Sequence, residues 1–482
     1  MEFSSLYFLY LFLPLTLLVY FLVPGLRLKN IVLLAASLLF YAMGQPVYVL
    51  LLVGLSYANF AMARRIRPGK RNTLFLPVVV NLAVLGLFKY LDFFLGIFGI
   101  TVADGGVMLA ALRGITNGLN SIGFAFRSPT SALPLGLSFY AFQVISYVAD
   151  VYRGKVKAER SLFNLLLYLS MFPKMMQGPI VRYEQVARQL MDRRTTPRAA
   201  FEGAQRFIIG LAKKVLLAGL LGTPFYALQA MGAEKLSVCG AWLGTLLYTL
   251  MLYFDFSGYS DMAIGAAKMF GFEFLANFDY PYCADSVASF WRRWHMSLGF
   301  WFRTYVYIPL GGSWYGAGRT IVNLLIVWGL TGIWHGADAT FLVWGLYYGL
   351  LLILEKFVLR EILAKIPAFL RRIGTFFLVM LGWVPFFSDS LAEAGAWLGR
   401  MFYAGPAGFL DQTARFYFRT SWPVLLIGLF AALPYGCRIG NRFYRMGRTA
   451  SVLSSVYFIL LLLLCVAGIV SGTYSSFLYA QF

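Results

Sequence analysis

The two histidines of this 482-residue chain are its strongest candidates for proton-transfer chemistry. His295 and His335 each follow a tryptophan, and each lies beside long apolar runs. Histidine is the side chain that most readily exchanges a proton near neutral pH. Because residues 289–338 carry both histidines, the sequence predicts a site of acid–base chemistry in this stretch.

His335 is the stronger candidate for a general base. Gly336 and Ala337 follow it directly and leave room for a substrate beside the ring. Apolar burial disfavours the imidazolium, so we expect a neutral ring that accepts a proton from a hydroxyl nucleophile. The alternative is a packed, hydrogen-bonded histidine without a catalytic role.

His295 is a candidate for a second, assisting histidine. Arg292 and Arg293 precede it, and guanidinium groups bind phosphate or carboxylate groups bidentately. His295 would then orient a donor or carry a proton, and the alternative is a basic rim with an incidental histidine. A metal site is not expected, because zinc needs three or four ligands and no further ligands occur at a recognisable spacing.

Two carboxylates, Asp255 and Asp261, lie next to an apolar run where a charge is costly. We expect them to pair with Lys213 or Lys214, in preference to a catalytic role. The residues that we assign to donor binding or support of the histidines are Arg292, Arg293, Trp294, Trp334, Asp338, Asp255 and Asp261.

The composition predicts a polytopic, all-helical membrane protein. Hydrophobic residues make up 60% and charged residues 13%, and apolar runs long enough to span a bilayer recur from end to end. We expect one membrane-embedded domain over residues 1–482. The net charge of +21 lies mostly in short loops between apolar runs. Membrane topology and attraction to anionic lipids explain that pattern, so no nucleic-acid partner is expected.

The basic loops also predict an orientation. Two basic loops are expected on the cytoplasmic side, which places both termini outside: residues 64–71 and the loop with Arg438, Arg442, Arg445 and Arg448. The first apolar run, residues 6–23, is expected to be retained as a helix rather than removed as a signal peptide.

Three local patterns depart from plain membrane spans. Residues 162–176 contain Pro173 and predict a broken or re-entrant helix, whereas residues 182–198 predict an amphipathic surface helix. Residues 298–310 and 321–334 predict a hairpin with the histidines on its two legs. A leg of ~14 residues rises only about 21 Å, less than the thickness of the bilayer core.

The chain resembles the membrane-bound O-acyltransferases, and within them the branch that acetylates alginate and related bacterial polysaccharides. The matching motifs fall in the family's order and cover most of residues 130–340. They are residues 134–147 (PLGLSFYAFQVISY) with Asp150, 171–183 (MFPKMMQGPIVRY), 255–261 (DFSGYSD), 289–297 (SFWRRWHMS), 308–313 (IPLGGS) and 334–337 (WHGA).

The resemblance implies a helical bundle with broken helices around a central transmembrane tunnel. Its catalytic core would cover about residues 130–360, followed by C-terminal helices over about 370–482. The family's catalytic histidine falls on His335, and an upstream position that is histidine or asparagine in relatives falls on His295.

For function, the resemblance implies acetyl transfer from a cytoplasmic thioester, acetyl-CoA, toward an exported or cell-surface polysaccharide. An extracytoplasmic, esterase-like partner would receive the acetyl group, and no tightly bound cofactor is expected. The protein would lie in the cytoplasmic membrane of a bacterium and cross it several times. D-alanyl transfer to teichoic acid from a carrier-protein thioester is the enzymatic alternative. A glycan transporter or flippase is the alternative without chemistry.

Overall fold

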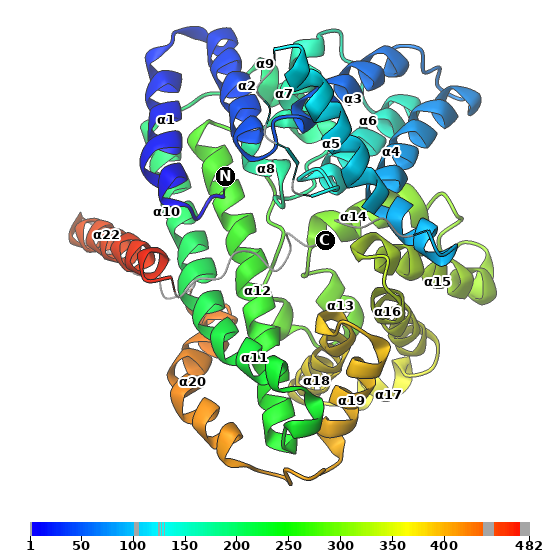
Figure 1. Cartoon of the computed structure of the whole chain (residues 1–482), viewed down its shortest axis with the longest axis vertical. Helices are drawn as coiled ribbons and strands as arrows, with labels where there is room; N and C mark the ends of the chain where they lie inside the picture. The colour runs from blue at the N-terminus through cyan, green and yellow to red at the C-terminus, as the bar shows by residue number, and fades with distance from the viewer. Residues whose placement is uncertain are drawn as a thin grey trace. The chain divides into compact units, whose positions relative to one another are not determined.

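The computed structural model describes residues 2–100, 106–123, 126, 128–129, 131–436 and 448–472. All regular secondary structure in these residues is helical (Figure 1). By length and composition, eight of the described helices can cross a membrane. The predicted all-helical, polytopic membrane fold is therefore confirmed. Of the predicted basic loop, Arg438, Arg442 and Arg445 lie outside the described residues, and Arg448 is the first residue of α22 (Arg448–Val470).

The described chain divides into two compact units. The first comprises Met1–Phe207 and Ala263–Leu275, and the second comprises Ile208–Met262 and Ala276–Phe482. Helices α10 (Pro197–Ala212) and α12 (Val238–Met269) contribute residues to both units. The further elements of the first unit are η1 (Phe8–Phe12), α1 (Leu13–Leu22), α2 (Gly25–Gly44), α3 (Tyr48–Ala63), α4 (Asn72–Ile97), α5 (Gly106–Ser121), α6 (Leu137–Tyr152), α7 (Leu162–Ser170), α8 (Phe172–Met175) and α9 (Tyr183–Met191).

The second unit holds both histidines. Its short elements η2 (Lys213–Ala218) and η5 (Arg303–Tyr307) are π-helical, so they interrupt the α-helical repeat. Its further elements are α11 (Gly219–Met231), η3 (Ala233–Lys235), η4 (Pro281–Cys283), α13 (Val287–Trp291), α14 (Met296–Phe302), α15 (Gly316–His335), α16 (Ala339–Phe357), α17 (Arg360–Lys365), α18 (Ala368–Phe387), α19 (Leu391–Phe402), α20 (Gln412–Ala431) and α22 (Arg448–Val470).

The predicted break in residues 162–176 is confirmed. Helix α7 ends at Ser170, Met171 has an extended ψ of 110°, and α8 begins with Pro173 in its first turn. The Lys174 side chain on α8 is fully buried: its ammonium group donates to Gln143 Oε1 and lies 4.3 Å from the centre of the Tyr168 ring. The amphipathic helix expected over residues 182–198 is shorter than predicted, because α9 ends at Met191.

The predicted lysine–aspartate pairs are also confirmed. Lys214 Nζ pairs with Asp255, and both side chains are buried. Lys213 Nζ lies 2.7 Å from Asp261 Oδ2, and this pair is partly exposed. The lysines lie on η2 and the aspartates on α12. These two elements approach closely, since a Cβ on Gly258 would lie 3.0 Å from the Lys214 backbone nitrogen.

The predicted short hairpin is wrong in one respect. Its first leg consists of α14 and η5 and is short, as expected. Its second leg, α15, has 20 residues and begins at Gly316, before the apolar run that the sequence pattern marks. At about 1.5 Å per residue, this helix is long enough to cross the apolar core of a bilayer.

Helices α15 and α16 pack with their backbones in close contact. A Cβ on Gly345 would lie 2.3 Å from the Trp328 carbonyl oxygen, and one on Gly332 would lie 2.4 Å from the Phe341 carbonyl oxygen. Small residues at such points let membrane helices approach. This contact fixes the end of α15, where His335 lies.

Replacing Gly345 with alanine is expected to destabilise the protein. The added methyl group must separate the helices, and overpacking of this kind costs roughly 1–3 kcal/mol. Gly329→Ala is the matched control, because its Cβ would meet only Leu342 and Leu346 side-chain atoms at 4.0 Å. The melting temperature in detergent should fall for Gly345→Ala and not for Gly329→Ala, and equal values for the two variants would contradict the close packing.

Candidate active site

His335 is the last residue of α15 and is buried, with an exposed fraction of 3%. Aromatic rings surround its imidazole. The ring centres of Trp334, Trp344 and Phe386 lie 4.8, 4.9 and 5.2 Å from the His335 ring centre. The chain then leaves the helix in an extended conformation at Gly336, where a Cβ would lie 2.3 Å from the Phe341 ring. The imidazole therefore lies in an apolar aromatic cluster.

His295 is the residue that precedes α14, and its backbone is left-handed, with φ 43° and ψ 54°. Tyr280 is the other described residue besides glycines that has a positive φ. The His295 side chain is 2% exposed, and the edge of its ring meets Phe256 at a centre-to-centre distance of 4.7 Å. The backbone thus turns this side chain into the interior at the start of the helix.

Asn277 determines which nitrogen of His295 carries the proton. The backbone N–H of Ser297 donates to Asn277 Oδ1 at 3.1 Å, which identifies this atom as the amide oxygen. The same oxygen lies 3.3 Å from His295 Nδ1. Because an oxygen without a proton can only accept, Nδ1 of the neutral ring carries the hydrogen. Nε2 is then the basic nitrogen.

Trp334 connects the two histidines. Its ring centre lies 4.8 Å from that of His335 and 6.5 Å from that of His295. The structure therefore brings together three residues that the sequence assigned to the site. His295 precedes the first leg of the α14–α15 hairpin and His335 ends its second leg, so the histidines lie on the two legs as predicted.

The segment before His295 is held by a carboxylate that sequence analysis missed. Glu355 on α16 accepts the backbone N–H groups of Val287 and Ala288 at 2.6 and 3.2 Å. These groups begin α13, and the Ser286 hydroxyl accepts the N–H of Ser289 at 3.0 Å. An anion is favourable at a helix N-terminus. Glu355 thereby fixes the short helix that leads into Arg292 and His295.

The remaining predicted residues lie in different surroundings. Trp294 is buried against Trp383 at 5.0 Å, so it supports the cluster by packing. Arg292 and Asp338 are exposed, and Arg293 lies 3.7 Å from the Asp279 carboxylate. Asp255 and Asp261 form the lysine pairs described above. A role of these residues in donor binding stays a prediction.

Several residues of the cluster have no clear signal in the sequence. Asn277 and Phe256 contact His295, and Trp344 and Phe386 contact His335. Glu355 offers the best clue, because it is an acidic residue near the end of an apolar run, where such a group needs a partner. In the part of the chain that the structure describes, no three His, Cys, Asp or Glu residues form a group that could hold a metal ion.

Replacing Asn277 with alanine tests whether His295 takes part in the reaction. The change removes the acceptor of His295 Nδ1 and of the Ser297 hydroxyl, which lies 2.9 Å from it. If His295 assists proton transfer, kcat is expected to fall by about tenfold or more, with an unchanged KM for the donor. Asn277→Asp keeps the acceptor and should restore part of the rate. An unchanged kcat in Asn277→Ala would show that His295 is structural.

The pH dependence of stability should show the burial of His295, which lies outside the membrane-crossing helices. Burial lowers the pKa of its imidazole from 6.5 to about 3. The unfolded chain then binds more protons between these pH values, so this group destabilises the fold as pH falls below about 6.5. The stability difference between the wild type and His295→Gln should be constant above pH 6.5 and shift against the wild type below it. A difference independent of pH in chemical denaturation would contradict this.

Comparisons with known proteins identify the family of this chain. The sequence model of MBOAT, the membrane-bound O-acyltransferase family, matches residues 156–380, which include both histidines. The probable alginate O-acetylase AlgI of Pseudomonas syringae is 41% identical over 84% of this chain and 76% of its own length. The protein of the same name from Pseudomonas putida is 35% identical over the whole of both chains.

A more distant relative is the teichoic acid D-alanyltransferase of Bacillus subtilis, which is 29% identical over 46% of this chain and 59% of its own length. Both names describe transfer of an acyl group. Residues 156–380, which the family model matches, contain the buried histidine pair, and eight described helices are able to cross a membrane. The chain is a multi-pass membrane O-acyltransferase and belongs to the membrane-bound O-acyltransferase family.

Proposed function

We propose that this protein transfers an acetyl group from acetyl-CoA toward the hydroxyl groups of an exported or cell-surface polysaccharide. The relatives named alginate O-acetylase cover most or all of the chain at 35–41% identity. The observation that carries the chemistry is that both buried imidazoles lie near the Trp334 ring, with ring centres 6.5 and 4.8 Å from it. Direct transfer of the acetyl group from thioester to hydroxyl needs a general base and does not need a nucleophilic serine or cysteine of the enzyme.

In this proposal, His335 is the general base. Its imidazole takes the proton of the acceptor hydroxyl, and the oxygen attacks the carbonyl carbon of the thioester. The carbon–sulfur bond then breaks, and the leaving thiolate receives the proton from the imidazolium. The overall reaction converts a thioester and an alcohol into an ester and a thiol. A base that works near its operating pH contributes about 10²–10⁴-fold to such a step.

His295 has an assisting role in this proposal. The Asn277 contact leaves Nε2 as its basic nitrogen, which suits it to accept or relay a proton. The apolar rings around both histidines exclude water and so limit hydrolysis of the thioester. A central tunnel, a cytoplasmic donor and an extracytoplasmic esterase-like partner complete the proposal and follow from the family resemblance.

The donor can be tested with the purified protein. The full chain in detergent is incubated with acetyl-labelled acetyl-CoA and a candidate esterase-like partner protein. We expect label on the partner or on added polysaccharide. Label that comes only from an acyl carrier protein would overturn acetyl-CoA as the donor and would support the D-alanyl alternative. In intact cells, polymer export that depends on this protein without any acyl transfer would support a transporter.

A further inference from the structure

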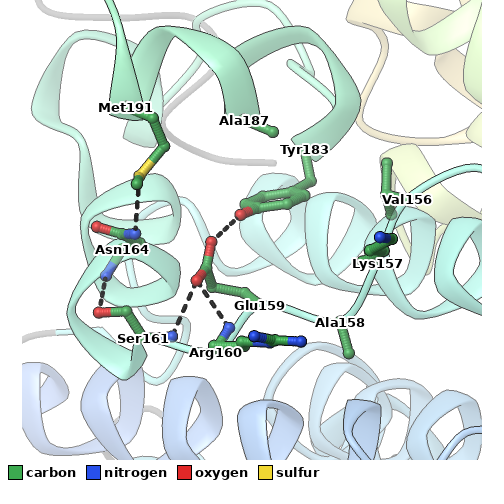
Figure 2. Close-up of a pocket in the computed structure, with 10 residues that line it drawn as sticks. All are labelled: Val156, Lys157, Ala158, Glu159, Arg160, Ser161, Asn164, Tyr183, Ala187 and Met191. Atoms are coloured by element: carbon green, nitrogen blue, oxygen red, sulfur yellow. Dashed lines mark hydrogen bonds between the residues drawn. The ribbon is translucent and has the colours of Figure 1, made fainter.

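A hollow of about 600 Å³ opens in the first unit. Figure 2 shows the residues that line it. The loop between α6 and α7 forms one wall, the start of α7 forms another, and α9 covers the third. Its volume lies in the range of small-molecule sites. The residues that line it are Val156, Lys157, Ala158, Glu159, Arg160, Ser161, Asn164, Tyr183, Ala187 and Met191.

The carboxylate in this hollow is already bound by the protein. Glu159 Oε1 accepts the backbone N–H groups of Arg160 and Ser161 at 2.7 and 2.9 Å, and Oε2 accepts the Tyr183 hydroxyl. The Glu159 N–H donates to the Tyr147 hydroxyl at 2.8 Å. Figure 2 shows the carboxylate between α9 and the loop. Its charge is thus stabilised by three donors, and it clamps the loop against the helix.

The cationic side chains of the lining, unlike the Glu159 carboxylate, do not bind groups of the protein in this loop. Lys157 and Arg160 are exposed, and the structure shows no ion pair for either among the residues it describes. Arg153 and Lys155 lie on the same loop. The lining therefore holds two basic side chains, and its single acidic group is bound by backbone and tyrosine donors. The hollow has an excess of positive charge.

The other lining residues are largely apolar. Val156, Ala158 and Ala187 contribute small hydrophobic surfaces, and Met191 has an exposed fraction of 70% at the end of α9. A ligand that fits this lining has an anionic part for Lys157 and Arg160 and an apolar part for Met191. A free phosphate or sugar phosphate satisfies only the first requirement.

We propose that this hollow binds the phosphodiester head of an anionic phospholipid, with the first carbons of its chains against Met191. The loop joins two apolar helices of a membrane protein, and loops with this basic content lie at the cytoplasmic leaflet, where anionic lipids are found. Arginine and lysine are the side chains that bind phosphate oxygens. The inference does not depend on the proposed acyl donor.

The test is a lipid titration of the full-length protein by native mass spectrometry. Phosphatidylglycerol is compared with phosphatidylcholine of the same chains, with inorganic phosphate and with coenzyme A. The variants are Lys157→Gln/Arg160→Gln, which removes the two cations, and Ala187→Trp, which fills the hollow. Lys70→Gln/Arg71→Gln is the matched control, because it removes two exposed charges from a different loop, outside the lining. Melting temperatures confirm that each variant is folded.

We expect the wild type and the control to retain phosphatidylglycerol in preference to phosphatidylcholine. The double variant in the hollow should bind it about 30-fold more weakly, since each of the two charges contributes roughly 1 kcal/mol. Ala187→Trp should weaken it although the charge is unchanged. Equal binding by the two double variants would overturn the proposal. Displacement of the lipid by coenzyme A, lost in the same variants, would assign the hollow to a nucleotide thioester and overturn the lipid.

Discussion

Replacing His335 with alanine is expected to abolish acyl transfer while export of the polymer continues. The imidazole is buried among Trp334, Trp344 and Phe386, so water cannot readily take its place as a base. Loss of a general base lowers a rate by about 10²–10⁴-fold. Polymer acetylation and polymer export are measured separately in cells that carry the variant.

The matched control is Thr331→Val, one turn earlier on α15. The Thr331 hydroxyl donates to the Val327 carbonyl oxygen at 2.7 Å within the same helix, so the change alters a buried side chain without removing a base. His335→Gln keeps a polar group of similar length and should also be inactive. Wild-type acetylation in His335→Ala would refute the role of His335. Loss of export together with acetylation in a folded variant would favour a transporter.

Breaking the buried Lys214–Asp255 pair is expected to have the largest effect on stability. Removal of one partner leaves an uncompensated charge in an apolar interior, which costs about 3–5 kcal/mol. Lys214→Ala or Asp255→Ala should therefore reduce the amount of folded protein in the membrane and lower its melting temperature. Lys213→Ala breaks a partly exposed pair and should cost less, on the order of 1 kcal/mol.

The double variant Lys214→Met/Asp255→Leu separates a structural role from a catalytic one. Apolar residues of similar volume often replace a buried ion pair without loss of stability. We expect the melting temperature to recover to near the wild-type value, with most of the acyl-transfer rate. A folded double variant that has lost its activity would show that Asp255 or Lys214 acts in the reaction.

The helical fold and the histidine pair were predictable because both leave strong local signals. Apolar runs longer than a bilayer core give the spans, and Pro173 marks the break between α7 and α8. The lysine–aspartate pairs follow from the cost of an isolated charge among apolar residues. The chain has only two histidines, and their position within residues 289–338, each after a tryptophan, indicates the site of acid–base chemistry.

The start of α15 and the partners of the histidines were not predictable. Helix α15 begins at Gly316, in a stretch whose Gly and Arg content hides the helical pattern. The contacts of Asn277 and Glu355 join residues separated by 18 and 68 positions along the chain. Such contacts depend on how the helices pack, and a local hydrophobic pattern carries no information about them.

The left-handed backbone at His295 also limits which residues this position can accept. Side chains with a branched Cβ are strongly disfavoured at φ 43°, whereas histidine, asparagine and aspartate adopt such angles more readily than other side chains. The family resemblance places histidine or asparagine at this position. The backbone conformation alone favours these residue types, whether or not the side chain takes part in the reaction. Sequence variation here is therefore a poor measure of proton transfer, because a change from histidine to asparagine satisfies the turn whether or not the base is needed.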